Sequence, residues 1–116
     1  PRMKLNLKES LLRLQQEGKL FTTLFSHGTL QVEIYRPQKI DLQQPHSRDE
    51  LYVIATGVSH FTAGEKEHEV VPGDVLFVPA GTKHRFSQFS HDFSTWVFFY
   101  GPEGGEKPQQ STSPSA

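Results

Sequence analysis

Apolar and polar residues alternate over several short stretches of this chain, which is the period expected of β-strands. The clearest case is the stretch in which Leu30, Val32 and Ile34 alternate with Gln31 and Glu33. Further strands are predicted at residues 21–26, 50–56, 58–62, 66–71, 75–78, 85–89 and 93–100. Many short strands separated by turn residues favour an antiparallel sandwich or barrel.

The two ends of the chain follow other patterns. Leucines between residues 4 and 18 predict a short N-terminal helix or arm over residues 1–19, with Ser10 as its N-cap and Gly18 at its end. Beyond Gly101 the composition shifts to Pro, Gly, Ser, Gln and Lys, which predicts a disordered tail over residues 102–116. The β-domain is therefore expected to occupy residues 20–101.

Composition narrows the classes of function. A chain of 116 residues is long enough for one domain, and 12 basic against 13 acidic side chains do not favour nucleic acid or a membrane surface as partner. The absence of cysteine excludes disulfides, a thiolate nucleophile and Cys-ligated zinc. No apolar run approaches the ~20 residues needed to cross a bilayer, and no signal peptide is recognised. These features predict a soluble, cytoplasmic protein.

The stretch from Pro72 to His84 carries the first candidate for chemistry. Pro72-Gly73 has the preference of a type II turn, after which an apolar strand starts at Val75. Pro79 and the following glycine end that strand and allow the chain to bend. The segment therefore delivers His84 to the start of the next strand.

A second candidate lies upstream, where His46 and Glu50 flank a short polar link. Glu50 opens an apolar strand, and a buried carboxylate needs a cation or hydrogen-bond donors. A metal ion held by His46, Glu50 and His84 would satisfy it, and two imidazoles with one carboxylate are a known ligand set for mononuclear sites with open positions. The alternative is a salt bridge to Arg48 or Arg85.

Both stretches resemble the conserved motifs of the cupin family. The second motif is matched by residues 73, 79, 81 and 84 and the first by residues 46, 50 and 57, in the expected order. The resemblance implies an all-β cupin-type double-stranded β-helix, or jelly-roll, barrel that holds one divalent transition metal ion, Fe, Mn, Ni or Zn. Two positions depart from the pattern, because Gln44 stands where the first histidine is usual and Gln88 where asparagine is often found.

Further site residues follow from the expected strand geometry. Gln44 lies two residues before His46 and would face the same side if the backbone is extended, so it is a candidate fourth ligand; a solvated loop residue is the alternative. Tyr52, Phe86 and Trp96 are first of all core residues and also candidates for the wall of a substrate-binding pocket. Asp49 faces away from Glu50 in a strand and is expected to be solvated. The other histidines, at 27, 60, 68 and 91, are expected at the surface.

A fold of this type does not choose a reaction. The leading hypothesis is a metal-dependent enzyme, such as an oxygenase, isomerase or lyase, that acts on a small oxygen-rich molecule. A non-catalytic module that binds or senses a small molecule is the alternative, and a structural cupin without metal is the third reading. The resemblance also implies a homodimer, because N-terminal segments of cupin-like proteins often cross to a second subunit.

Overall fold

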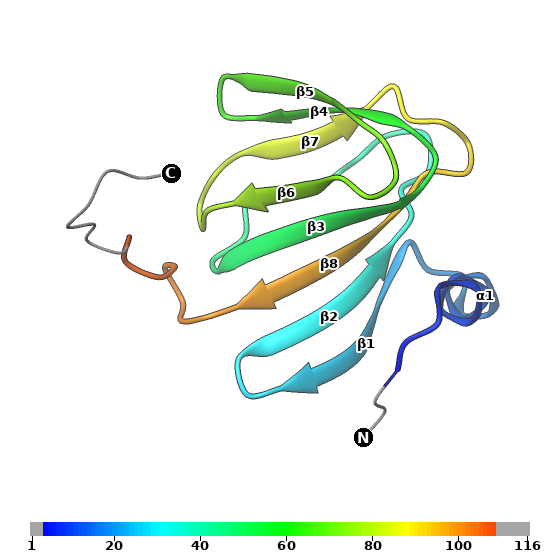
Figure 1. The fold of residues 1–116 in the computed structure, drawn as a ribbon, viewed down its shortest axis with the longest axis horizontal. Coiled ribbons are helices and arrows are strands. Elements are labelled where there is room, and N and C mark those ends of the chain that lie inside the picture. The colour runs from blue at the N-terminus through cyan, green and yellow to red at the C-terminus, as the bar shows by residue number, and fades with distance from the viewer. Residues whose placement is uncertain (1–3, 109–116) are drawn as a thin grey trace.

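Two antiparallel sheets and one helix make up the protein, whose computed structural model describes residues 4–108 (Figure 1). The larger sheet has the strand order β1-β2-β8-β3-β6, formed by Phe21–His27, Leu30–Tyr35, Ser94–Tyr100, Asp49–Thr56 and Val75–Val78. The smaller has the order β5-β4-β7, formed by Lys66–Val70, Ser59–Ala63 and His84–Ser87. The all-β prediction is confirmed, and most strand boundaries lie within a few residues of those expected.

The core lies between the two sheets and consists largely of aromatic residues. Tyr52 of β3, Phe61 of β4 and Phe86 of β7 pack on one another with ring centroids 4.7–5.9 Å apart, and each is almost fully buried. Phe93 extends the cluster 4.9 Å beyond Phe86. Because these rings come from both sheets, burying them holds one sheet against the other.

A close approach of two loops locks one end of this core. Gly57, directly after β3, has φ +72°, and a Cβ atom there would lie 2.5 Å from Ser90 Oγ and 2.7 Å from Phe93 Cα. No side chain fits in that space, so residue 57 must be glycine for the chain to pass beside the start of β8.

The helix α1 (Leu7–Glu17) packs on its own chain. Its contacts are with β1 and β2, and Leu14 is its buried apolar residue (Figure 1). Gly18 ends it with φ 63°, as predicted, but Ser10 is not its N-cap. Asn6 caps the helix by accepting a hydrogen bond from the Glu9 amide, while the Ser10 hydroxyl donates to the Asn6 carbonyl within the first turn. No helix among residues 4–108 is long and apolar enough to cross a membrane.

The first residues after β8 also differ from expectation. Residues 102–108 were expected to begin a disordered tail, yet they return to the start of β3 and are held there by backbone hydrogen bonds. The Gly104 amide donates to the Ser47 carbonyl at 2.6 Å, and the Glu106 amide donates to Asp49 Oδ2 at 2.8 Å. A low content of apolar residues does not prevent docking when a partner supplies acceptors. The rest of the expected tail, 109–116, lies outside the described residues.

Candidate metal centre

Three side chains from separate parts of the chain meet at one point between the sheets. His46 comes from the loop before β3, Glu50 from β3 and His84 from the first position of β7, and their ligand atoms lie within 4.8 Å of one another. His84 Nε2 is 2.9 Å from Glu50 Oε1, and His46 Nε2 is 3.8 Å from the same oxygen. The structure therefore brings together the three ligands predicted from their spacing.

The loops that carry these residues lie side by side. The Gly81 amide in the β6–β7 turn donates a hydrogen bond to the His46 carbonyl at 2.7 Å. Asp49 links the same regions, because its Oδ1 accepts from the Ala80 amide at 2.9 Å while its Oδ2 accepts from Glu106. Asp49 is only 5% exposed, so the expectation that it is solvated is wrong. Its side chain points away from Glu50, as expected, but into the turn and the C-terminal segment.

One hydrogen bond fixes the orientation of the His84 ring. Nδ1 lies 2.8 Å from the Thr82 carbonyl oxygen, which can only accept, so Nδ1 carries a proton and Nε2 faces Glu50. Burial by itself lowers the pKa of His84, but the Glu50 carboxylate, the Thr82 carbonyl and the charge of Asp41 together raise that pKa above its ordinary value. Nε2 is thus placed to hold either a proton or a metal ion.

His46 has the opposite tendency. Burial lowers the pKa of its ring, and the nearby Glu50 charge opposes this shift without cancelling it. The ring packs edge-on against Phe99 with centroids 4.9 Å apart and lies 5.3 Å from the His84 ring. A neutral His46 offers a lone pair, which is the form that ligates a metal ion.

The polar atoms at this point are buried and lack partners. Both carboxylate oxygens of Glu50 and Nε2 of His84 are buried without a hydrogen-bond partner among the described residues, and Nε2 and Oε1, which are 2.9 Å apart, form an ion pair only when the ring is protonated. Leaving such groups unpaired costs about 1–3 kcal/mol each, and more when they are charged. A divalent cation would satisfy all three atoms, and two imidazoles with one carboxylate suit a transition metal. The residues present therefore fit the metal that the sequence predicted.

The glutamine beside this cluster is Gln43, not the predicted Gln44. Gln44 is exposed, whereas Gln43 Oε1 lies 3.3 Å from His46 Nε2 and accepts a 2.9 Å hydrogen bond from the Tyr52 hydroxyl. Gln44 and His46 would face the same side only in an extended strand. Residues 41–48 instead form a loop, in which Pro45 directly precedes His46. Gln43 is the side chain near enough to add a fourth donor.

A buried carboxylate holds Gln43 in place. Asp41 is fully buried and accepts from the Gln43 side-chain amide at 3.0 Å, from the Tyr35 hydroxyl at 2.6 Å and from the Phe86 amide at 2.8 Å. Because the Gln43 NH₂ group is engaged by Asp41, its carbonyl oxygen must face Tyr52 and His46. Asp41 and Gln43 could not be predicted as site residues from the sequence, since nothing in their local pattern separates them from ordinary loop residues.

A cavity of about 820 Å³ opens beside His46, within the range of small-molecule sites. It lies over the inner face of β1, β2 and β8, which the smaller sheet leaves uncovered. Its surface is mostly apolar, and its lining residues are Lys19, Leu20, Phe21, Thr22, Thr23, Glu33, Tyr35, Leu42, Gln43, His46, Val97 and Phe99.

None of the three predicted pocket residues lines this cavity. Tyr52 and Phe86 are fully buried in the core, although the Tyr52 hydroxyl reaches the site through Gln43. Trp96 pairs with Ile34 and Val53 on the outer face of the sheet, so its neighbours Val97 and Phe99 supply the wall instead. Both faces of β8 are apolar, and the sequence pattern alone could not choose between them.

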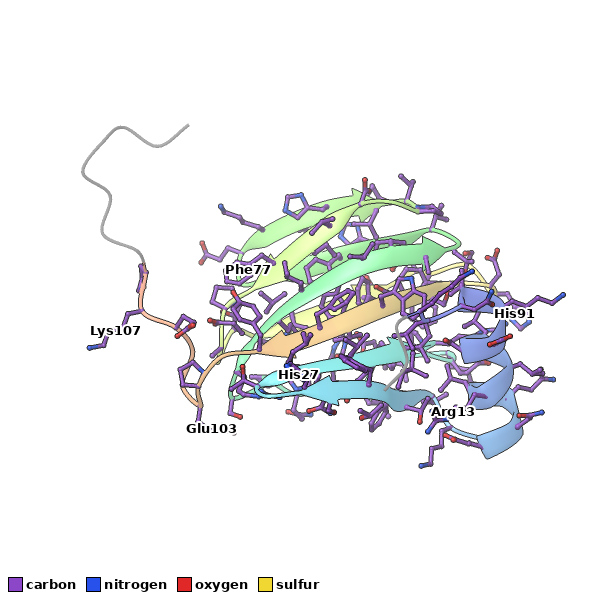
Figure 2. The ribbon with its side chains drawn as sticks, turned by 60° about the horizontal axis from the view of Figure 1, so that its bottom comes forward. Arg13, His27, Phe77, His91, Glu103 and Lys107 are labelled. Atoms are coloured by element: carbon purple, nitrogen blue, oxygen red, sulfur yellow. The ribbon has the colours of Figure 1, made fainter. Side chains whose placement is uncertain are left out.

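The remaining histidines lie away from the site. His27, His68 and His91 are exposed, as expected, and Figure 2 shows His27 and His91 at the turns that carry them. His60 was also expected at the surface, but it is half-buried and pairs with Glu69 at 2.7 Å on the smaller sheet. This pair provides an internal comparison for the metal centre, because it has the same residue types without the buried, unpaired atoms.

Comparisons with known proteins agree with this architecture. The model of the cupin domain family matches residues 31–99. An uncharacterised protein of Streptomyces coelicolor is 40% identical over 63 residues, which is 54% of this chain and 60% of that protein. The chain thus matches less than two thirds of the length of that relative.

Solved structures share the fold at low identity. A cupin-2 domain protein of Shewanella frigidimarina superposes with a TM-score of 0.65 at 11% identity, over 84% of this chain and 94% of that one. A cupin superfamily protein of Desulfitobacterium hafniense gives 0.59 at 23% identity, over 70% and 75% of the two chains. Together with the two sheets and the His-Glu-His cluster, the match over residues 31–99 shows that the chain belongs to the cupin domain family.

Proposed function

We propose that this cupin is a metal-dependent enzyme that acts on a small oxygen-rich molecule bound in the cavity beside His46. The observation that supports this most strongly is the set of buried, unpaired atoms on Glu50 and His84 next to His46, which itself lines a cavity of about 820 Å³. An ion pair with only a structural role does not need a cavity beside it. A site that binds and converts a small molecule needs such a cavity.

The donor set would be His46 Nε2, Glu50 Oε1 and His84 Nε2, with Gln43 Oε1 as the fourth donor. A divalent transition metal held there would supply Lewis-acid or redox chemistry at its open positions. The ion is Fe, Mn, Ni or Zn, because imidazole with carboxylate suits each of these metals. The Thr82 carbonyl and Asp41 keep the His84 ring and the Gln43 amide in fixed orientations.

The surrounding residues would orient the substrate and exclude water. Val97 and Phe99 form an apolar floor beside His46, so a bound molecule would displace solvent from that side. Burial raises the pKa of Tyr52 well above its ordinary value, and the Glu50 charge adds to the effect. The Tyr52 hydroxyl therefore remains a hydrogen-bond donor to Gln43 at all ordinary pH values.

A non-catalytic binding module is the second candidate, and one observation favours it. Near Gln43 the described residues offer no free carboxylate, because Asp41 is hydrogen-bonded to Tyr35, and Glu33, the one carboxylate that lines the cavity, lies two strands away from Glu50. An enzyme usually needs a positioned acid or base.

The two candidates differ in turnover. Protein loaded with each of the four metals would be incubated with a panel of catechols, hydroxy acids and enediols, and followed by oxygen uptake and by NMR of the products. The enzyme proposal expects turnover with at least one metal, lost in His84→Ala. Tight binding without turnover for any metal would favour the binding module.

A further inference from the structure

A group of polar side chains lies on the inner face of the larger sheet, across the cavity from the metal centre. Gln31 Nε2 donates to Glu33 Oε2 at 2.9 Å and to Thr23 Oγ1 at 3.1 Å, and the Thr23 hydroxyl lies 3.3 Å from the same carboxylate oxygen. Thr23 and Glu33 both line the cavity. A carboxylate is thus held in a fixed position on a wall that is otherwise mainly apolar.

One oxygen of Glu33 is left for a ligand. The hydrogen bonds described within residues 4–108 all go to Oε2, and Oε1 is not among the buried unpaired atoms. Burial raises the pKa of Glu33, and the Glu50 charge adds to that rise. The Glu50 charge therefore acts on Glu33 across β8, the strand that separates β2 from β3.

The strand register sets the separation between this group and the metal centre. Glu33 on β2 pairs with Val97 on β8, and Val97 pairs with Tyr52 on β3. Neighbouring strands are about 4.8 Å apart, so Glu33 and the strand that carries Glu50 are about 10 Å apart across the sheet. A molecule the size of one substituted six-membered ring would span this distance over Val97 and Phe99.

The charges around the cavity favour a donor over an anion at the Glu33 end. Of the described lining residues, Lys19 is the one ammonium, and it is exposed at the end of α1. Arg48 is held by the Thr29 carbonyl and Gln31 Oε1, and it is not among the groups that shift the pKa of Glu33. An anionic group next to Glu33 would meet a like charge without a cation.

We propose that the cavity selects a bifunctional small molecule, with a metal-binding oxygen group at one end and a hydroxyl or ammonium donor at the other that bonds to Glu33 Oε1. Its middle part is apolar and rests on Val97 and Phe99. This selectivity rests on the proposed function, because the first group is placed by the metal. Glu33 thereby determines specificity against ligands that carry a carboxylate or phosphate at that end.

The test compares three probes that share one chelating end. Catechol, dopamine and dihydroxyphenylacetate would be titrated calorimetrically into protein loaded with Zn(II), which has no redox chemistry. Metal content is measured first. Dopamine should bind at least about tenfold more tightly than dihydroxyphenylacetate, because a hydrogen bond to a charged group contributes about that factor.

Glu33→Gln keeps the shape and the acceptor for Gln31 but removes the charge. In this variant the ratio between dopamine and dihydroxyphenylacetate should fall to within about threefold, while the affinity for plain catechol stays unchanged. Glu65→Gln, in an exposed turn, is the matched control and should keep the wild-type ratio. Equal affinities in the wild type, or a preference that persists in Glu33→Gln, would overturn the proposal.

A protein that holds no zinc would contradict the proposed function and not the role of Glu33. In that case phenethylamine and phenylacetate, which lack chelating hydroxyls, would be titrated into the metal-free protein. A preference for the amine that disappears in Glu33→Gln would support the selectivity. No binding, or no preference, would overturn it.

Discussion

Gln43 and Gln44 are neighbours in sequence but occupy different surroundings. Gln43 contacts His46, Tyr52 and Asp41, while Gln44 is exposed. Gln43→Ala should therefore lower the metal affinity by about tenfold or more, the usual effect of losing a group that contacts a ligand. Gln44→Ala should match the wild type. The measurement is the chelator concentration that removes half of the bound metal from each variant.

A reversed result, with Gln44→Ala losing metal and Gln43→Ala keeping it, would mean that the loop adopts another conformation when metal binds. The sequence predicted three ligands because their motif spacing is tied to turns and strand starts. It misplaced the fourth because face alternation applies within strands, and residues 41–48 are not a strand.

His84 should make the stability of the metal-free protein depend on pH. Its pKa is raised in the folded state, so the folded protein binds this proton more tightly than the unfolded chain. The resulting stabilisation is fully present below the ordinary histidine pKa of 6.5 and is lost as the pH rises through the raised value. The stability difference between wild type and His84→Gln should thus be larger at about pH 6 than at about pH 9.

This difference is measured by urea unfolding in the presence of a chelator. His46 shifts in the opposite direction, but it is present in both proteins and its contribution largely cancels in the comparison. A difference that grows with pH would contradict the assignment of the proton to His84.

At the scale of elements, the C-terminal segment supports the loop between His46 and Glu50. Its backbone amides donate hydrogen bonds to Ser47 and Asp49, which lie between the two ligands. Figure 2 shows Glu103 and Lys107 on this segment, at the opposite end of the sheet from Arg13 on α1. Truncation after Gly101 leaves a buried acceptor on Asp49 and should cost about 1–3 kcal/mol in thermal or urea unfolding. Metal should also be lost at a lower chelator concentration.

Truncation after Pro108 is the control, because it leaves all of these hydrogen bonds in place.

Two glycines in the same segment allow a finer comparison. Gly104 and Gly105 have nearly equal φ values of +87° and +89°, but a Cβ at 105 would lie 2.8 Å from Asp49 Oδ1 whereas one at 104 meets nothing within 4 Å. Gly105→Ala should be clearly less stable than Gly104→Ala. Equal stabilities of the two variants would show that the docking of residues 102–108 on Asp49 does not stabilise the folded protein.

In the molecule as a whole, the hydrophobic core and the cavity are separate regions. Phe86 is buried among rings from both sheets, so Phe86→Leu should destabilise the protein by about 1–3 kcal/mol. Phe89→Leu, at the half-buried edge of the same cluster, should cost less. Because Phe86 does not line the cavity, the affinity of the zinc-loaded variant for catechol should not change. A weaker affinity of fully zinc-loaded Phe86→Leu for catechol would show that Phe86 contributes to the binding site.

Much of the fold could be predicted because each strand is bounded by residues with strong turn preferences. Pro72-Gly73 and Pro79 delimit β6, and Gly57 closes β3. The role of residues 102–108 could not be predicted, since it depends on acceptors far away in sequence. Homodimerisation stays a prediction. Val75 and Phe77 on β6 are 61% and 52% exposed, and an interface between two copies would cover such apolar side chains. Figure 2 shows Phe77 at the edge of the sheet. The molar mass from sedimentation would check it.

The most direct test of the account is elemental analysis of the purified protein after incubation with each metal and gel filtration. The wild type should retain about one ion per chain, and both Glu50→Ala and His84→Ala should retain almost none while staying folded by circular dichroism. His60→Ala, which removes the pair of His60 and Glu69 on the smaller sheet, should retain as much as the wild type. Wild-type metal content in Glu50→Ala and His84→Ala would show that these buried, unpaired side chains do not form the metal centre.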